Sequence, residues 1–209
     1  NRWWSAVSKL SIIYPYHCVY SMGRARDVVI FTRLPMNELE VPNNIQGKHL
    51  PFVLLEMETG QYGVPWLLGL ANLPGLRSSK DRHKRNLAID TFAARMNAYQ
   101  WSTLKGEPLD ARVLIGDLNV TPWSPYLKRM LRITDMKDAQ DGKGFMGTWP
   151  AWMGDKLGIP ADHTLVSRNI YVTSRKAGDA FRAGHLPVVT TFDIPVLSSL
   201  FQQGHAMMR

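Results

Sequence analysis

The sequence predicts an α/β or α+β fold, a layered sandwich in which mostly antiparallel sheets are flanked by helices. Three observations favour this class. Short apolar runs typical of strands recur along the 209-residue chain, a long helical pattern separates two of them, and two early runs are joined by a short turn. A chain with both hairpins and a strand–helix–strand unit is typical of layered sheet and helix.

The composition is that of a globular domain with a basic surface. Hydrophobic residues make up 45% of the chain, and no apolar run is long enough to cross a membrane. The single cysteine, Cys18, excludes an internal disulfide and a cysteine-based zinc site. A net charge of +8 fits an anionic partner such as a phosphate ester, nucleic acid or acidic lipid, and ordinary solubility charge explains it equally well.

The first third of the chain predicts one short helix and three strands. Apolar residues at near-helical spacing predict an amphipathic helix over 3–13. Strands are expected over 27–32, 51–57 and 64–73, and the turn residues at 61–63 indicate an antiparallel hairpin between the last two. The chain starts with asparagine and not methionine, which we interpret as a fragment that lacks its first strands.

A long helix is expected from Ser78 or Ser79 to about Leu104. Its apolar stripe is formed by Ala88, Phe92, Met96 and Tyr99. Its first turns are basic, which is unfavourable at a helix N-terminus unless an anion lies nearby. The basic stretch Arg77–Arg85 is either a guide for a polyanion or a solvated helix face.

The rest of the chain alternates strands, loops and one short helix. Strands are expected over 111–116, 163–167, 170–174 and 187–194, a helix over 124–131, and a mobile, polar loop over 137–147. We expect one domain over residues 1–197 and a tail over 198–209.

One polar pair follows a buried strand. In the stretch Gly116–Asp117–Leu118–Asn119, extended backbone would place Asp117 and Asn119 on one side and Leu118 in the core. A carboxylate can hold a metal or orient a water, and a carboxamide can hold a phosphate oxygen. Aspartate and asparagine are also natural turn formers, so a plain turn remains an alternative.

Two further polar groups stand beside later strands. Asp162 heads the stretch ADHTLVS, and His185 precedes the strand in GHLPVV. An aspartate and a histidine from different strands can pair, the aspartate fixing the tautomer of the histidine. A lone histidine near a strand is more often structural. Trp123, Trp149 and Trp152 lie in nearby loops and either stack on a ligand or pack structurally.

The order GDLN, TWP, ADHTLVS and GHLPVV resembles the endonuclease/exonuclease/phosphatase superfamily of metal-dependent phosphoesterases. The resemblance covers about residues 3–194 and is similar to a bacterial subgroup that often carries membrane helices ahead of the catalytic domain. It implies that Asp117 aligns or deprotonates the attacking water and that Asn119 contacts the scissile phosphate. It also implies that Asp162 hydrogen-bonds the catalytic His185. His163 falls at a variable position without assigned chemistry.

The chain departs from the family pattern at three places. Gly184 stands where the family has a metal-site aspartate, and Asn72 stands where it often has histidine, although Asn72 can still bind phosphate. The principal metal-binding glutamate of the family is expected upstream of residue 1, which leaves Asp117 as the metal ligand in this chain.

The resemblance therefore implies a phosphoester hydrolase, either a phosphodiesterase or nuclease or a phosphatase, that uses Mg²⁺ or Mn²⁺ and an activated water. Its substrate is expected to be a phosphate ester, with nucleic acid and phospholipid as alternatives. A degenerate relative that binds an anionic ligand or nucleic acid without catalysis remains a second hypothesis.

Overall fold

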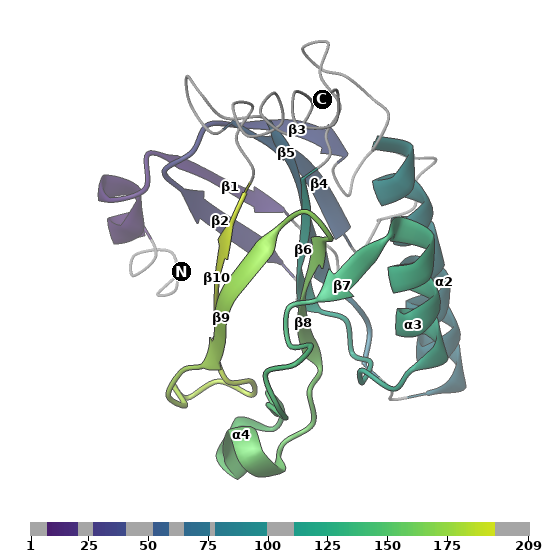
Figure 1. Cartoon of the computed structure of the whole chain (residues 1–209). Coiled ribbons are helices and arrows are strands. Elements are labelled where there is room, and N and C mark those ends of the chain that lie inside the picture. Colours follow the sequence, from purple (N-terminus) through teal and green to yellow (C-terminus); the bar gives the residue numbers. More distant parts are fainter. Residues whose placement is uncertain are drawn as a thin grey trace, which may run out of the picture.

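The structure is a computed structural model that describes residues 8–20, 27–40, 52–58, 65–75, 78–99 and 111–194. It confirms the predicted fold class, with mostly antiparallel sheets flanked by helices (Figure 1). Several sequence predictions lie wholly or partly outside the described residues, among them the start of the first helix, the first residue of each of the strands expected at 51–57 and 64–73, the turn at 61–63, the end of the long helix and the tail at 198–209. The division of the chain at residue 197 stays a prediction.

A six-stranded sheet forms the centre of the molecule, with the strand order β3-β4-β5-β6-β8-β7. Its strands are β3 (Met36–Glu40), β4 (Phe52–Met57), β5 (Trp66–Asn72), β6 (Arg112–Asp117), β7 (Met136–Asp138) and β8 (Asp162–Ser167). The predicted hairpin is confirmed, because β4 and β5 pair antiparallel. β5 and β6 run parallel and are joined through α2 (Ser79–Tyr99), which is the predicted strand–helix–strand unit.

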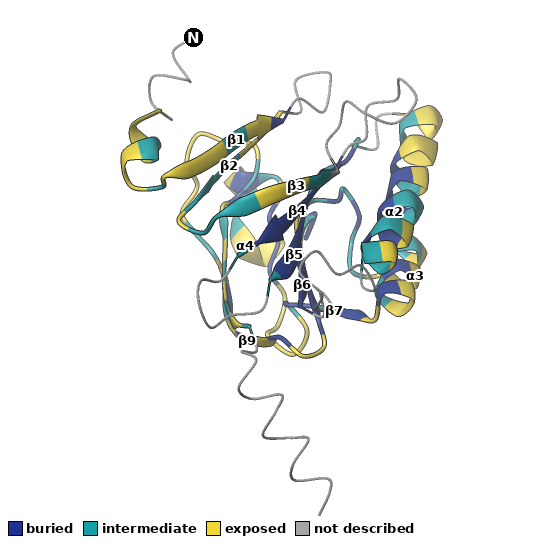
Figure 2. Ribbon diagram, turned by 90° about the horizontal axis from the view of Figure 1, so that it is seen from above, coloured by how far each residue is buried: buried dark blue, intermediate teal, exposed yellow. Residues whose placement is uncertain are grey.

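Alternate residues of the central strands face two different cores. On β4, Phe52 and Leu54 pack under the helices, whereas Val53 and Leu55 pack on the opposite face. A strand with both faces covered reads as a continuous apolar run, and this is why all of β4 is buried (Figure 2).

Two antiparallel strand pairs cover one face of the central sheet (Figure 1). β1 (Tyr16–Tyr20) pairs with β2 (Val28–Thr32), and β9 (Tyr171–Ala177) pairs with β10 (Val188–Asp193). Apolar side chains from both pairs join one core with the central strands. The Phe192 ring meets the Trp66 ring edge-on, with 6.3 Å between their centroids.

Helices α2 and α3 (Pro125–Thr134) cover the other face (Figures 1 and 2). The predicted stripe of α2 is confirmed, since Ala88, Phe92 and Met96 are buried in this core and Tyr99 packs against it. No helix in the described ranges is both long and apolar enough to span a bilayer.

Ser78 caps the N-terminus of α2. Its Oγ accepts a hydrogen bond from the Asp81 N–H at 3.1 Å and donates one to Asp81 Oδ2 at 2.9 Å. This reciprocal arrangement and the negative charge of Asp81 offset the basic residues of the first turns.

Some elements differ from the sequence predictions. The predicted amphipathic helix is wrong in its described part, where Ser8–Ile12 forms a 3₁₀ helix, η1, with no buried residue. The predicted mobile loop at 137–147 is wrong at its start, because its first two residues complete β7 and Asp138 is buried.

β1, β3 and β7 are not predicted at all, since their short, partly exposed or polar sequences lack a clear apolar alternation. Two short helices, η2 (Ala151–Met153) and α4 (Gly154–Leu157), complete the described elements.

The strand register sets three polar residues side by side at one end of the central sheet. Asn72 of β5 pairs in register with Asp117 of β6, and Asp117 pairs with Asp162 of β8. The end of β6 thus meets the beginning of the antiparallel β8, so residues 45 positions apart in sequence become cross-strand neighbours.

We expect Gly116→Ala to destabilise the protein by about 2 kcal/mol or more, measured by urea unfolding. Gly116 has a φ of 150°, and a Cβ there would overlap the carbonyl oxygen of Ala71 on the neighbouring strand. Gly184→Ala is the control, because a Cβ at Gly184 meets nothing within 4 Å. Similar unfolding midpoints for the two variants would contradict this account of the β5–β6 contact.

Candidate active site

The structure brings Asp117, Asn119, Asp162 and His185 together at the end of the central sheet. Asp117 ends β6, Asp162 begins β8, and His185 lies in the loop between β9 and β10. The Nδ1 atom of His185 lies 2.7 Å from Asp162 Oδ2, and its Nε2 atom lies 3.9 Å from Asp117 Oδ2. The imidazole therefore stands between the two carboxylates.

Asn119 does not continue the extended strand, as the sequence pattern suggested, but adopts a left-handed conformation with a φ of 50°. Its backbone N–H donates to Asp117 Oδ1 at 2.9 Å, which forms an Asx-turn, and its Nδ2 donates to Asp117 Oδ2 at 2.8 Å. Leu118 between them is fully buried, as expected. The stretch is thus a turn, as one of the two alternatives predicted, and its side chains lie in the candidate site, where their role stays a prediction.

The Nδ2 group of Asn119 also donates to the carbonyl oxygen of Leu73 at 2.8 Å. Both hydrogens of this carboxamide are therefore engaged with protein acceptors. In this arrangement, Asn119 orients the carboxylate of Asp117.

The loop that carries His185 is attached to a neighbouring segment. The N–H of Leu186 donates to the carbonyl oxygen of Thr148, and the N–H of Ala151 donates to that of Gly184, each at 2.8 Å. The Thr148 Oγ1 accepts hydrogen bonds from the N–H groups of Ala161 and Asp162, both at 3.1 Å. Thr148 thus links the histidine loop to the start of β8.

The surroundings push the pKa values of the three titratable groups in different directions. Burial, with the nearby charge of Asp162, raises the pKa of Asp117 to about 6 against the opposing hydrogen bonds from Asn119. Burial alone would raise the pKa of Asp162, but hydrogen bonds with His185 and Thr148 outweigh it, and this pKa lies below its ordinary value. The hydrogen bond to Asp162 raises the pKa of His185.

With these pKa shifts, Asp162 and His185 form a hydrogen-bonded pair. Asp162 is held as a carboxylate that accepts the Nδ1–H of His185, and the Nε2 atom of His185 faces Asp117. His185 keeps 34% of its side chain exposed, so a ligand can reach it.

Asp117, Asp162 and His185 also form a group that could hold a metal ion, with one ligand atom from each lying within 4.8 Å of the others. Asn72 is half-buried beside Asp117 in the strand register, and its binding of phosphate stays a prediction. Gly184 precedes His185, and there is open space where its side chain would be.

The three tryptophans singled out in the sequence are exposed to 63% for Trp123, 44% for Trp149 and 82% for Trp152. Structural packing, one of their two interpretations, is therefore wrong for Trp123 and Trp152. Trp149 and Trp152 lie within two residues of Ala151, whose N–H binds the histidine loop.

Sequence reasoning missed four residues that support this site, namely Arg85, Asp138, Thr148 and Arg175. Arg85 donates from Nη1 to the carbonyl oxygen of Asn119 at 2.7 Å, so this residue of the basic helix start contacts the backbone of the candidate site. For Asp138 and Arg175 the sequence carries no local signal of these contacts, because His163 lies 25 residues from Asp138 and Asp162 lies 13 residues from Arg175. For Thr148, the TWP motif was a usable signal.

A family model described as the Endonuclease/Exonuclease/phosphatase family matches residues 2–184. The chain belongs to this family. The matched range covers the whole candidate site except His185. A search of the curated proteins found no match.

Solved structures show the same fold at low sequence identity. The catalytic domain of human nocturnin, with bound sulfate, matches with a TM-score of 0.66 and 12% identity, over 92% of this chain and 76% of that chain. A mannosyl-6-phosphatase from Bacteroides thetaiotaomicron matches with a TM-score of 0.57 and 14% identity, over 91% and 82%. A beta toxin double mutant from Staphylococcus aureus, with bound magnesium ions, matches with a TM-score of 0.55 and 16% identity, over 88% and 76%.

We expect Asp162→Asn to lower the pKa of His185, measured by NMR titration of the imidazole protons. The Asp162 carboxylate raises this pKa through its hydrogen bond and charge, and a neutral amide removes the charge while burial still favours the neutral ring. Asp179→Asn is the matched control, because Asp179 is exposed in the same loop and should leave the titration unchanged. Equal pKa values of His185 in the wild type and in Asp162→Asn would contradict the pairing.

Proposed function

We propose that this endonuclease/exonuclease/phosphatase family member hydrolyses a phosphate ester with an activated water and a divalent cation. The observation that carries the proposal is the placement of His185 between Asp162, at 2.7 Å, and Asp117, at 3.9 Å. Family membership supports the reaction class, and the net charge of +8 suits an anionic substrate.

His185 is the proposed donor toward the reacting phosphate. Asp162 accepts the Nδ1–H and stabilises the imidazolium, so the Nε2–H is free to donate to a phosphate oxygen as negative charge develops there. Asp117 then orients the attacking water or takes its proton. A pKa of about 6 suits this role, because the carboxylate is ionised at neutral pH and is still basic enough to accept a proton.

Asn119 has the proposed role of holding Asp117 in this orientation. The resemblance implies that it also contacts the scissile phosphate. Because its two amide hydrogens are used by Asp117 and Leu73, such a contact requires one of these bonds to open when substrate binds. Asn72, next to Asp117 in the register, is the other proposed phosphate ligand.

The donor set fits a hard divalent cation with Asp117 as its protein ligand. Carboxylate oxygens suit Mg²⁺ or Mn²⁺, and Mg²⁺ sites often use one or two carboxylates with water and substrate phosphate. Asp162 and His185 direct atoms at each other, which leaves Asp117 as the available carboxylate in the cluster. When bound, the ion would neutralise phosphate charge and lower the pKa of a coordinated water. Magnesium ions are present in the beta toxin structure named above.

A specific observation favours a second candidate function. Gly184 leaves the site without a carboxylate beside His185, so binding of an anionic ligand without turnover is the alternative. The phosphate ester itself can come from nucleic acid, a phospholipid or a small phosphorylated molecule. Nocturnin and mannosyl-6-phosphatase, both similar in fold, do not separate these sources.

We expect Asp117→Ala and His185→Ala each to lower kcat for a generic phosphodiester or phosphomonoester, with Mg²⁺ or Mn²⁺ present, by roughly 100-fold or more, because each removes a group that acts on the reacting atoms. Turnover is measured by product release with the intact protein. His17→Ala is the matched control, since His17 is exposed on β1 and its ring stacks on that of Phe31. Equal activity in the wild type and in His185→Ala would overturn the assignment.

We expect Gly184→Asp to bind Mg²⁺ at least about tenfold more tightly than the wild type, because it adds a carboxylate ligand where the chain has open space. Isothermal titration calorimetry measures the affinity. Gly184→Asn has the same size without the charge and serves as the control. Equal affinities in the two variants would contradict a metal site at this position, and turnover in Gly184→Asp alone would favour the non-catalytic reading of the natural chain.

A further inference from the structure

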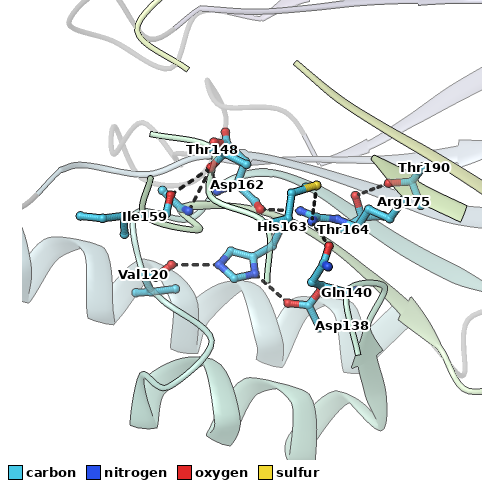
Figure 3. Close-up of polar contacts among 12 residues, drawn as sticks. Val120, Asp138, Gln140, Thr148, Ile159, Asp162, His163, Thr164, Arg175 and Thr190 are labelled. Carbon is cyan, nitrogen blue, oxygen red and sulfur yellow. Dashed lines mark hydrogen bonds and ion pairs between the residues drawn. The ribbon is translucent and has the colours of Figure 1, made fainter. Parts of the chain in front are cut away.

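A polar network built on the buried His163, Asp138 and Arg175 adjoins Asp162 of the candidate site (Figure 3). The Nδ1 atom of His163 lies 2.8 Å from Asp138 Oδ2, and its Nε2 atom lies 2.9 Å from the carbonyl oxygen of Val120. His163 is 3% exposed and Asp138 is 5% exposed. Because a carbonyl oxygen can only accept, Nε2 carries the proton in this contact, and the contact has one defined direction.

Arg175 extends the network to the other strand end. Its Nη2 donates to the carbonyl oxygen of Asp162 at 2.7 Å, and its Nη1 donates to Gln140 Oε1 at 2.6 Å. The backbone N–H of Gln140 in turn donates to Asp138 Oδ1 at 2.9 Å. A continuous set of contacts therefore joins the carbonyl of Val120 to the carbonyl of Asp162 (Figure 3).

Both of these carbonyls belong to the backbone of the candidate site. Val120 follows Asn119, whose own carbonyl oxygen accepts the hydrogen bond from Arg85. The turn after β6 is thus held at two successive carbonyls by buried donors, and the start of β8 is held at a third. The turn after β6 carries Asp117 and Asn119. The start of β8 carries Asp162, which binds His185 of the β9–β10 loop.

We propose that His163 is a positioning residue, which fixes the Asn119–Val120 turn through its Nε2–H donation to Val120, while Arg175 fixes the Asp162 end. The proposal rests on the proposed function for its kinetic consequence. It does not rest on it for the geometry of the turn, which can be measured without substrate.

If His163 and Asp138 only stabilised the fold, the exact place of the hydrogen-bond donor would matter little. Buried ion pairs are often replaced by apolar residues of similar volume at little cost in stability. If His163 positions the turn, a hydrogen-bond donor must occupy the place of its Nε2 atom. The reason is that the left-handed conformation of Asn119 is kept only while the surrounding contacts are made. The two nitrogen atoms of His163 can therefore be tested separately.

The test compares His163→Gln with His163→Asn. The terminal amide of glutamine reaches the place of Nε2 and can donate to Val120, but it leaves Asp138 without its histidine partner. The amide of asparagine reaches the place of Nδ1 and can donate to Asp138, but it leaves Val120 without a donor. We expect His163→Gln to unfold at lower urea and yet keep kcat within about threefold of the wild type. We expect His163→Asn to be the more stable variant and to lose kcat by about tenfold or more, with KM little changed.

Val166→Ala on the same strand controls for loss of stability, because Val166 is an apolar residue buried in the core on the face of the sheet away from the helices. It should lose stability and keep kcat. If kcat follows stability across the three variants, or falls equally in glutamine and asparagine, the positioning role is overturned.

NMR of the Asn119 backbone and carboxamide N–H groups, which donate to Asp117, gives a readout without turnover. These resonances should keep their wild-type positions and exchange protection in His163→Gln and shift in His163→Asn. Shifts of equal size in both variants would overturn the proposal even if the wild type proves inactive. A clear difference in NMR with no wild-type turnover would instead uphold the positioning role and count against the proposed hydrolysis.

Discussion

The antiparallel pairing of β6 with β8 is the constraint on which the rest of the site depends. It places Asp117, the last residue of one strand, opposite Asp162, the first residue of the other. The parallel β5 adds Asn72 at the same level, and this pairing requires the close approach of Gly116 to Ala71. Burial and the nearby charge of Asp162 raise the pKa of Asp117, and the interaction with His185 opposes this rise. The sheet therefore supplies the positions of the two carboxylates, and the histidine loop supplies the imidazole that lies between them.

Local pattern was sufficient for the central strands because both of their faces are buried and read as continuous apolar runs. It was also sufficient to place Asp117 at a strand end, whereas Asp162 and His185 were singled out as its companions by the resemblance to the family, which the order of the later motifs carries. The conformation of Asn119 was not predictable in this way, since the left-handed turn depends on contacts with Leu73 and Arg85. β7 and the buried Asp138 were missed because a three-residue strand has no detectable period and its partners are distant in sequence.

Charged side chains are buried both beside the site and elsewhere in the described structure. Glu56 and Arg112 are buried away from the site, whereas His163, Asp138 and Arg175 are buried beside it, in positions that apolar side chains could fill. Such groups cost desolvation energy and stabilise less than good apolar packing. The contacts of His163 with the Val120 carbonyl and of Arg175 with the Asp162 carbonyl give a reason for this desolvation cost. Both carbonyls belong to the backbone segments that orient Asp117 and Asp162. At Gly184 the site instead lacks a charged side chain, and there is open space in which one would fit.

The central claim is that Asp117, Asp162 and His185 direct a water at phosphorus. Its most direct test is hydrolysis of a phosphate ester by the intact protein in ¹⁸O-labelled water with Mg²⁺ or Mn²⁺, followed by mass spectrometry of both products. The account predicts one ¹⁸O atom in the phosphate-bearing product and none in the alcohol, because the bond between phosphorus and the leaving oxygen is the one that breaks. Label in the alcohol, or no turnover of any phosphate ester with metal present, would contradict it.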